Sequence, residues 1–181
     1  MKKRILLIAL LVLLIALYST GTYSNPVYTQ KATNVITAGS VDVKIHEYTA
    51  SGEVYPNIPV VIMPGDVVGK RVEVENTGSS PAFLRVKLTP GINDEKLTAA
   101  DCIQMDINDA DWTYQDGYYY YNQILQPGQT TSALLTRVTF DGTKVTNAYL
   151  GKLFSLNVEV QAVQSEHNGA EPLEAQGWPE H

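Results

Sequence analysis

Hydrophobic and polar residues alternate with a period of two in several short stretches of this sequence. The alternation is clearest in residues 41–46, 84–88 and 154–163. Successive side chains of a strand point to opposite faces, so the pattern is typical of strands with one buried face. Each of these stretches is predicted to be a β-strand.

Turn residues separate the stretches and indicate more strands. Pro64-Gly65-Asp66 ends a short apolar run, and Asp116-Gly117 is a favoured two-residue hairpin turn between two aromatic stretches. The further strands predicted on this basis lie at residues 60–63, 72–75, 112–114, 118–121 and 134–140. Many short strands without a pattern for a long helix predict an all-β fold, an antiparallel β-sandwich of immunoglobulin-like or jelly-roll type.

The first residues have a different pattern. A basic run, Lys2-Lys3-Arg4, precedes an unbroken apolar run over residues 5–17, and small and polar residues follow over 19–24. This is the order of regions in a secretory signal peptide, and the apolar run is shorter than the roughly 20 residues that span a bilayer. Small residues at Thr22 and Ser24 place the predicted cleavage between Ser24 and Asn25. The alternative is an uncleaved membrane anchor, the one membrane contact that the sequence suggests.

These boundaries give a predicted organisation of the chain. Residues 1–24 form the signal peptide, residues 25–40 an N-terminal segment, residues 41–164 the β-sandwich domain, and residues 165–181 a polar C-terminal tail. The protein is therefore expected to be secreted.

The net charge of the chain is −6, and it falls to −9 when the three cationic residues of the signal peptide are removed. An acidic surface argues against a nucleic-acid partner and against adhesion to anionic lipid. Cys102 is the only cysteine, so the domain cannot contain an internal disulfide. It is interpreted as a buried small hydrophobe, with a reactive thiol as the alternative.

Candidate chemistry is sparse. The three histidines, His46, His167 and His181, have no spacing suited to zinc or to nucleophilic catalysis. We therefore expect no enzyme activity and no cofactor. The tyrosines of residues 118–121 could form a carbohydrate-stacking platform, but alternation along a strand favours one pair in the core and one on the surface.

One polar stretch is a candidate calcium site. Asp106, Asn108, Asp109 and Asp111 place oxygen side chains at close spacing within a predicted long loop over residues 89–111. Calcium prefers such ligands, although the glycine and the distal glutamate of an EF-hand loop are missing. A solvated acidic loop is the alternative.

Several blocks together resemble the TasA/camelysin family of secreted proteins of Gram-positive bacteria. The blocks occur in the order and spacing of that family and cover nearly the whole chain. They are residues 33–43 (TNVITAGSVDV), residues 72–88 with Glu-Asn-Thr-Gly-Ser-Ser-Pro-Ala at the centre, residues 112–129 with the tyrosine run, and residues 157–179 with a closing Gly-Trp-Pro.

The resemblance implies a jelly-roll sandwich, release by a signal peptidase of the SipW type, and a role in surface fibres or a biofilm matrix. It also implies that the mature N-terminus acts as a donor strand that completes the sheet of the next subunit, giving a head-to-tail homopolymer. The matching segment is residues 25–36, with Val27, Tyr28, Val35 and Ile36 as its apolar anchors. Pro26 departs from the family pattern and cannot donate a ladder hydrogen bond, so pairing is expected to begin after it. The protease activity attached to the camelysin name has no residues to match it here.

The leading hypothesis from the sequence is thus a secreted structural subunit of extracellular fibres. Two alternatives remain open: a monomeric surface module that binds a glycan or a protein through residues 112–121, and a secreted metallopeptidase.

Overall fold

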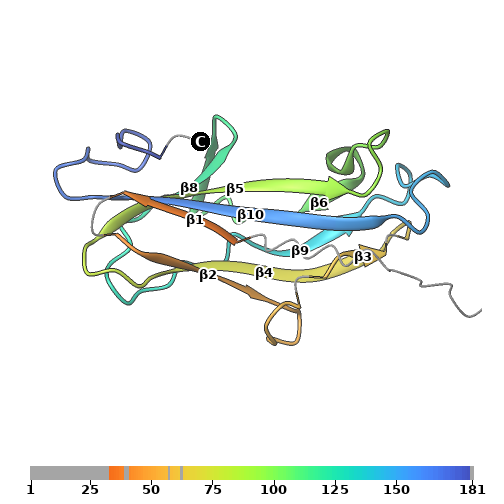
Figure 1. Cartoon of the computed structure of the whole chain (residues 1–181), viewed down its shortest axis with the longest axis horizontal. Helices are drawn as coiled ribbons and strands as arrows, with labels where there is room; N and C mark the ends of the chain where they lie inside the picture. Colours follow the sequence, from red (N-terminus) through yellow and green to blue (C-terminus); the bar gives the residue numbers. More distant parts are fainter. Residues whose placement is uncertain (1–32, 39–40, 57, 62, 180–181) are drawn as a thin grey trace, which may run out of the picture.

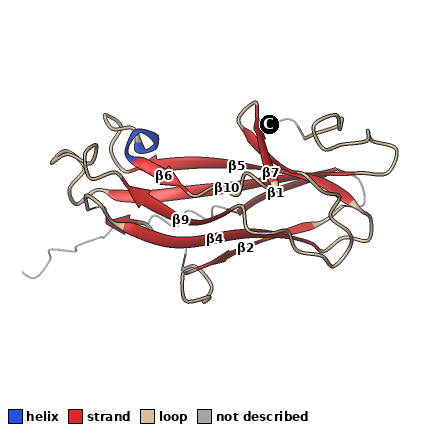
Figure 2. Cartoon of the chain, turned by 180° about the vertical axis from the view of Figure 1, so that it is seen from behind, coloured by secondary structure: helices blue, strands red, loops and turns tan. Residues whose placement is uncertain are grey.

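The computed structural model describes residues 33–179 except 39–40, 57 and 62, and these residues form a pair of β-sheets that pack face to face (Figure 1). The strands are β1 (Thr33–Ala38), β2 (Val43–Tyr48), β3 (Val60–Val61), β4 (Val67–Asn76), β5 (Ala82–Ile92), β6 (Ile103–Met105), β7 (Trp112–Gln115), β8 (Tyr118–Tyr121), β9 (Leu135–Phe140) and β10 (Leu153–Gln164). A short 3₁₀ helix, η1 (Ala99–Cys102), is the one helical element among the described residues, and Figure 2 shows it at one end of the sandwich. The expected all-β sandwich is confirmed.

The first sheet has the order β1-β10-β5-β8-β7, with β3 also paired to β10, and the second has the order β2-β4-β9-β6. Among these described strands, every pair is antiparallel except β1 with β10, which is parallel. β1 leads directly into β2 of the other sheet and has no hairpin to β10, so no turn imposes an antiparallel direction on it. The one parallel pair among these strands therefore lies at the edge of an otherwise antiparallel sheet.

The inward-facing side chains of the alternating strands fill the space between the sheets. Val72 and Val74 of β4, Leu84 of β5, and Val158 and Val160 of β10 are all fully buried. The predicted hairpin turn is also present, with φ values of 51° at Asp116 and 86° at Gly117. Both angles are positive, as a type I′ turn requires, and only a few residue types accept them readily.

Cys102 lies at the end of η1 and is completely buried. Its thiol donates a hydrogen bond to the carbonyl oxygen of Ala99 at 3.2 Å. Burial raises the pKa of this thiol, which disfavours the reactive thiolate. The interpretation of Cys102 as a buried small hydrophobe agrees with these contacts.

The C-terminal segment packs on the outer side of the first sheet, beside the β7–β8 hairpin (Figures 1 and 2). Ala175 is buried against Phe83 and Val163, and Trp178 packs on the same cluster. The side chain of Asn168 holds the segment together through two hydrogen bonds to the backbone of Gln176. Its amide nitrogen donates to the Gln176 carbonyl oxygen, and its oxygen accepts from the Gln176 N–H. The polar tail expected from the sequence is thus an ordered layer as far as residue 179.

Within the described residues, no helix is long and apolar enough to cross a membrane. The predicted signal peptide lies outside these residues.

Candidate functional site

The outer face of the first sheet carries a cluster around Arg85 of β5. The guanidinium carbon lies 3.9 Å from the ring centre of Tyr118 and 4.6 Å from that of Trp178. Arg85 also donates hydrogen bonds from Nε to Gln161 at 2.8 Å and from Nη1 to the hydroxyl of Tyr120 at 3.0 Å. Stacking between two aromatic rings is a preferred environment for an arginine side chain. Arg85 therefore ties the C-terminal segment, through Trp178, to the sheet.

The tyrosine run alternates between the two faces of β8. Tyr121 is buried in the core, with its ring 5.0 Å from that of Trp112, and Tyr119 packs against the core with its ring 4.8 Å from that of Tyr114. Tyr118 and Tyr120 face outward and surround Arg85. These rings therefore do not form a flat exposed platform for a sugar. The side chains alternate between the two faces as expected, but Tyr120 is not a surface residue, because it is 6% exposed and packs edge-on against Trp178 of the C-terminal segment.

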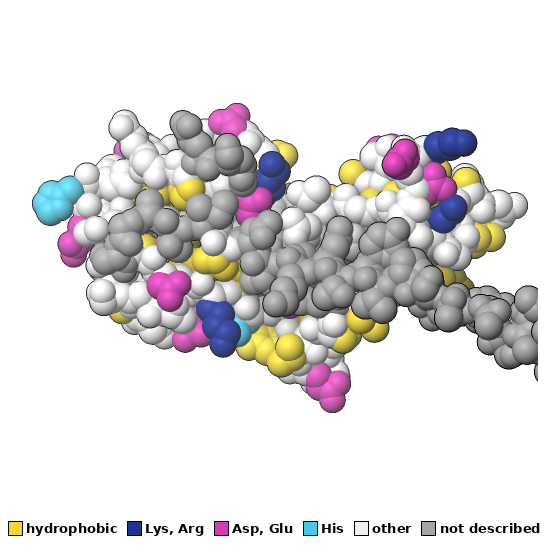
Figure 3. Space-filling model, viewed as in Figure 1, with side chains coloured by type: hydrophobic (Ala, Val, Ile, Leu, Met, Phe, Trp, Pro, Cys, Tyr) yellow, Lys and Arg dark blue, Asp and Glu magenta, His cyan; other side chains and the backbone are white. Residues whose placement is uncertain are grey.

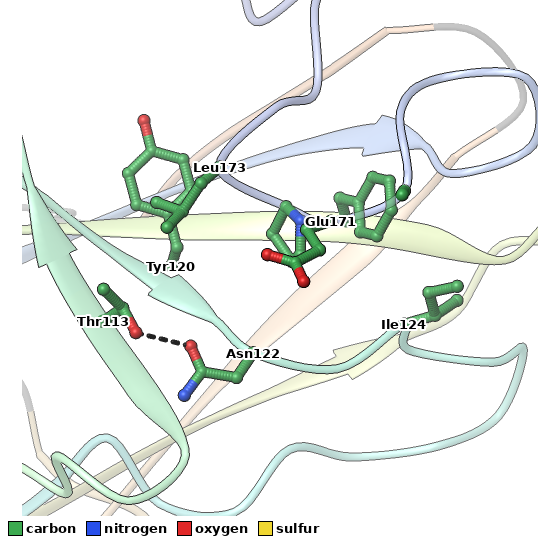
Figure 4. A pocket seen from close by; sticks show the side chains of 9 residues that line it. Thr113, Tyr120, Asn122, Ile124, Glu171 and Leu173 are labelled. Atoms are coloured by element: carbon green, nitrogen blue, oxygen red, sulfur yellow. Dashed lines mark hydrogen bonds between the residues drawn. The ribbon is translucent and has the colours of Figure 1, made fainter.

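A hollow of about 320 Å³ lies between the C-terminal segment and the β7–β8 hairpin (Figure 4). Phe83 and Ile124 supply apolar surface from the sheet side, and Leu173 supplies it from the C-terminal segment. The polar groups that line the hollow are Thr113, Asn122 and Glu171. In Figure 4 the carboxylate of Glu171 points toward the amide of Asn122, whose oxygen accepts a hydrogen bond from the hydroxyl of Thr113 at 2.8 Å.

The outer edge of β10 is the second candidate site. β1 pairs with residues 158–163 of β10, with Thr33 opposite Val158 and Ala38 opposite Val163. β3 pairs with Leu153 and Phe154 at the other end of the same edge. The longest strand of the first sheet is therefore covered on this side by two short strands from the N-terminal third of the chain.

Of the anchors expected in the N-terminal segment, Val35 and Ile36 belong to β1. Val35 is half-buried against the core and lies opposite Val160, and the backbone of Ile36 lies opposite Gln161. Val27 and Tyr28 lie outside the described residues, as do the cleavage residues Thr22, Ser24 and Asn25.

Exposed apolar side chains gather in the stretch that contains β3. Val54, Ile58, Val61, Met63 and Val67 are each about half exposed or more. Figure 3 shows hydrophobic side chains on the face that includes β2 and the loop after it. A concentration of exposed apolar residues in one short segment is a frequent mark of an interaction surface.

A buried ion pair lies between β2 and β4. Lys70 Nζ is 2.6 Å from Glu47 Oε1, and the two side chains are only 5% and 8% exposed. The ammonium also lies 4.1 Å from the ring centre of Tyr55. Desolvation lowers the pKa of Lys70, although the neighbouring Glu47 carboxylate opposes this, and burial raises the pKa of Tyr55. Nothing in the alternation of the sequence indicated this pair.

Asp106, Asn108 and Asp111 of the candidate calcium loop are engaged in hydrogen bonds within the chain. Asp106 accepts hydrogen bonds from the backbone amides of Thr136 and Arg137 at 2.9 and 2.8 Å. Burial alone would raise the pKa of Asp106, but these bonds and the Thr136 hydroxyl hold the pKa below its usual range. Asp111 instead accepts from the side chain of Asn108 at 3.0 Å. Across the described residues no group of three or more His, Cys, Asp or Glu side chains is placed to hold a metal ion. The oxygens of Asp106 and Asp111 are thus used to fasten the loop to β9 and to itself.

The histidines lie apart from one another. His46 Nε2 is 2.7 Å from Glu75 Oε2 on the outer side of the second sheet, while His167 lies in a turn at a φ of 60° after β10. His181 is outside the described residues. The two described histidines therefore do not form a joint site.

Sequence reasoning missed the contacts of the C-terminal segment, because Arg85 and Trp178 are far apart in the chain and no local pattern joins them. The one available signal was composition: a tryptophan and two prolines in a stretch otherwise interpreted as a polar tail. No family model, no curated protein and no solved structure matches this chain.

Proposed function

We propose that this protein is a secreted structural subunit of extracellular fibres or a biofilm matrix, and that subunits join head to tail by strand addition. The observation that carries the proposal is β1, a short N-terminal strand that lies parallel to β10 at the edge of the first sheet. In a fibre, the segment that begins at the mature N-terminus would occupy the same edge in the next subunit.

The edge of β10 suits such an exchange. Val158, Val160 and Ala162, which are all fully buried, lie in the stretch of β10 that β1 covers. If β1 leaves, a row of unpaired backbone groups and the apolar side chains beside them become available to another strand. Strand addition then restores both the ladder hydrogen bonds and the burial.

The connection of β1 also suits the exchange. β1 is joined to the rest of the described domain only at its C-terminal end, through the short link to β2. It can therefore leave its own sheet without unthreading the sandwich. A contact in which one end of a subunit enters a different surface of the next does not close on itself, so it propagates as a filament.

The exposed apolar segment around β3 provides further contact area on the accepting subunit. β3 shares the edge of β10 with β1, and Val61 and Met63 are 49% and 58% exposed in the isolated chain. An incoming strand longer than β1 would reach this surface. The resemblance of four sequence blocks to the TasA/camelysin family and the predicted signal peptide support the same function.

A monomeric surface-binding module is the second candidate, and the hollow beside the C-terminal segment is the observation that favours it. The metallopeptidase alternative is not proposed. The described residues bring no metal-binding cluster together, and the acidic loop that suggested one is engaged in structural hydrogen bonds.

Deletion of residues 25–36 tests the donor segment. Because the deletion removes the first four residues of β1, we expect the protein to lose fibres under electron microscopy while its far-ultraviolet circular dichroism remains that of a β-protein. Addition of a synthetic peptide of residues 25–38 is expected to occupy the open edge and to leave the protein monomeric. Fibres that form as readily as those of the unaltered chain would contradict the proposal.

A further inference from the structure

The hollow beside the C-terminal segment is assembled from two distant stretches of the chain. One wall comes from the β7–β8 hairpin and the residues after it, with Thr113, Asn122 and Ile124, and the other comes from Glu171 and Leu173. The contact between Arg85 and Trp178 holds the second wall in place. The hollow thus has defined sides, formed by an ordered hairpin and a segment fixed to the sheet.

Its lining combines apolar surface with a few oriented polar groups. Phe83 and Pro172 are buried and form apolar surface, whereas Ile124 and Leu173 are 42% and 38% exposed at the rim. Thr113 orients the Asn122 amide, because its hydroxyl donates a hydrogen bond to Asn122 Oδ1. Among the described residues, Asn122 Nδ2 has a long contact of 3.4 Å with the carbonyl oxygen of Ala110. Such a mixture is typical of sites for small ligands, and the volume of about 320 Å³ lies at the lower end of the range of small-molecule pockets.

The charge of the residues that line the hollow limits the class of ligand that it can bind. Glu171 brings a carboxylate into the hollow, and no Lys, Arg or His side chain of the described residues lies within ion-pair distance of it. The other polar groups, an amide and a hydroxyl, are neutral. An anionic ligand is disfavoured here, while a cation with additional hydrogen-bonding groups gains a charge-assisted hydrogen bond.

We propose that the hollow formed by Thr113, Asn122, Ile124, Glu171 and Leu173 binds a pyranose that bears a protonated amino group. Glu171 accepts hydrogen bonds from the ammonium, Asn122 and Thr113 bond the ring hydroxyls, and the carbon–hydrogen face of the ring packs on the apolar wall. The site binds either a free amino sugar or one unit of an amino-substituted polysaccharide, since the chemistry that it recognises is the same. This inference does not depend on fibre formation.

Ligand-observed saturation-transfer NMR with the purified protein tests the site, and it works for monomers and fibres alike. The probes are glucosamine, glucose and glucuronate. We expect millimolar binding of glucosamine, binding of glucose that is up to about fivefold weaker, and no binding of glucuronate, because a charge pair with the exposed Glu171 carboxylate contributes up to about 1 kcal/mol. A partly deacetylated chitosan oligomer distinguishes the two sources: tighter binding of the oligomer than of glucosamine assigns the site to a polymer.

Two carboxylates of the C-terminal segment provide a matched pair of variants. Glu171→Gln removes the charge inside the hollow and is expected to weaken glucosamine binding by up to about fivefold, to the level of glucose. Glu174→Gln removes an exposed charge three positions away that does not line the hollow, and is expected to leave binding unchanged. Ile124→Trp, at an exposed rim position, is expected to fill the hollow and abolish binding.

Three results would overturn the inference. They are no binding of glucosamine in the millimolar range, equal binding of glucose and glucosamine, and binding that Glu171→Gln leaves unchanged. Because Glu171 is exposed, its replacement is not expected to unfold the chain, and an unchanged circular dichroism spectrum verifies this.

Discussion

Replacement of Lys70 by alanine is expected to destabilise the protein by about 3–5 kcal/mol. The substitution leaves the Glu47 carboxylate, only 8% exposed, without the ammonium that lies 2.6 Å away. Burial of a charge without a partner costs far more than loss of the attraction itself, because the desolvation penalty remains. Urea denaturation followed by tryptophan fluorescence measures the change.

A second ion pair of nearly equal length provides the control. Lys152 Nζ lies 2.7 Å from Asp94 Oδ2, but the two side chains are 34% and 25% exposed. We expect Lys152→Ala to cost no more than about 1 kcal/mol, since water and ions screen an exposed pair. The burial of the pair, and not the distance between its charged atoms, thus determines how much unfolding free energy each alanine variant loses.

The double variant Lys70→Met with Glu47→Leu tests whether the loss of stability comes from the unpaired Glu47 charge, because it removes both charges and keeps side chains of similar volume. Replacement of a buried ion pair by apolar side chains of similar volume is often neutral or stabilising. We expect the double variant to recover most of the stability lost in Lys70→Ala. Equal losses for Lys70→Ala and Lys152→Ala would contradict this interpretation of the pair.

Replacement of Trp112 by alanine is also expected to cost about 3–5 kcal/mol. Trp112 is 1% exposed and packs against Tyr121 in the main core, so alanine leaves a large cavity between the sheets. The same denaturation assay, followed by circular dichroism because the variant lacks this fluorophore, measures the loss.

Trp112→Phe is expected to lose less stability than Trp112→Ala. One reason is that the indole N–H of Trp112 has no hydrogen-bond partner in the described residues. Phenylalanine removes this unpaired polar group and fills most of the space, so the cost is expected to stay under about 2 kcal/mol. Tyr114→Ala, on the same strand but 63% exposed, is expected to cost about 1 kcal/mol or less. If Trp112 were a ligand platform, its replacement would reduce binding and leave stability unaltered.

The strands that the sequence predicted are those with one face in the core. β2, β5 and β10 alternate clearly because their inward residues fill the space between the sheets. β4 was predicted only from Val72, whereas it begins at Val67. A register shift between Gly69 and Val72 interrupts the alternation there, and the polar residue Lys70 occupies a buried position.

The strands that were missed are short or lie at an edge. β6 has three residues, too few for a period to be recognised, whereas the two-residue β3 was predicted within residues 60–63 from its apolar run and the turn that follows. The residues of β1 were expected to belong to a donor strand for the next subunit and not to the chain's own sheet, since their place in that sheet depends on pairing with β10, which is more than a hundred positions away in the chain. The hollow was missed for a similar reason, because its walls come from residues 113–124 and 170–173.

Disulfide trapping tests the proposed strand exchange most directly. Asn34 of β1 lies opposite Glu159 of β10, so cysteines at these two positions are in register for a disulfide. The test variant is Asn34→Cys with Glu159→Cys, in a chain where Cys102 is replaced by serine. The matched control, Asn34→Cys with Gln164→Cys, moves one cysteine five positions along β10, about 16 Å out of register.

We expect oxidised monomers of the test variant to contain a disulfide within one chain. Oxidised fibres are predicted to give a ladder of disulfide-linked chains on a non-reducing gel, which collapses to single chains on reduction, while the control gives neither product. Failure of the purified protein to form fibres, or fibres in which every disulfide lies within one chain, would contradict strand exchange.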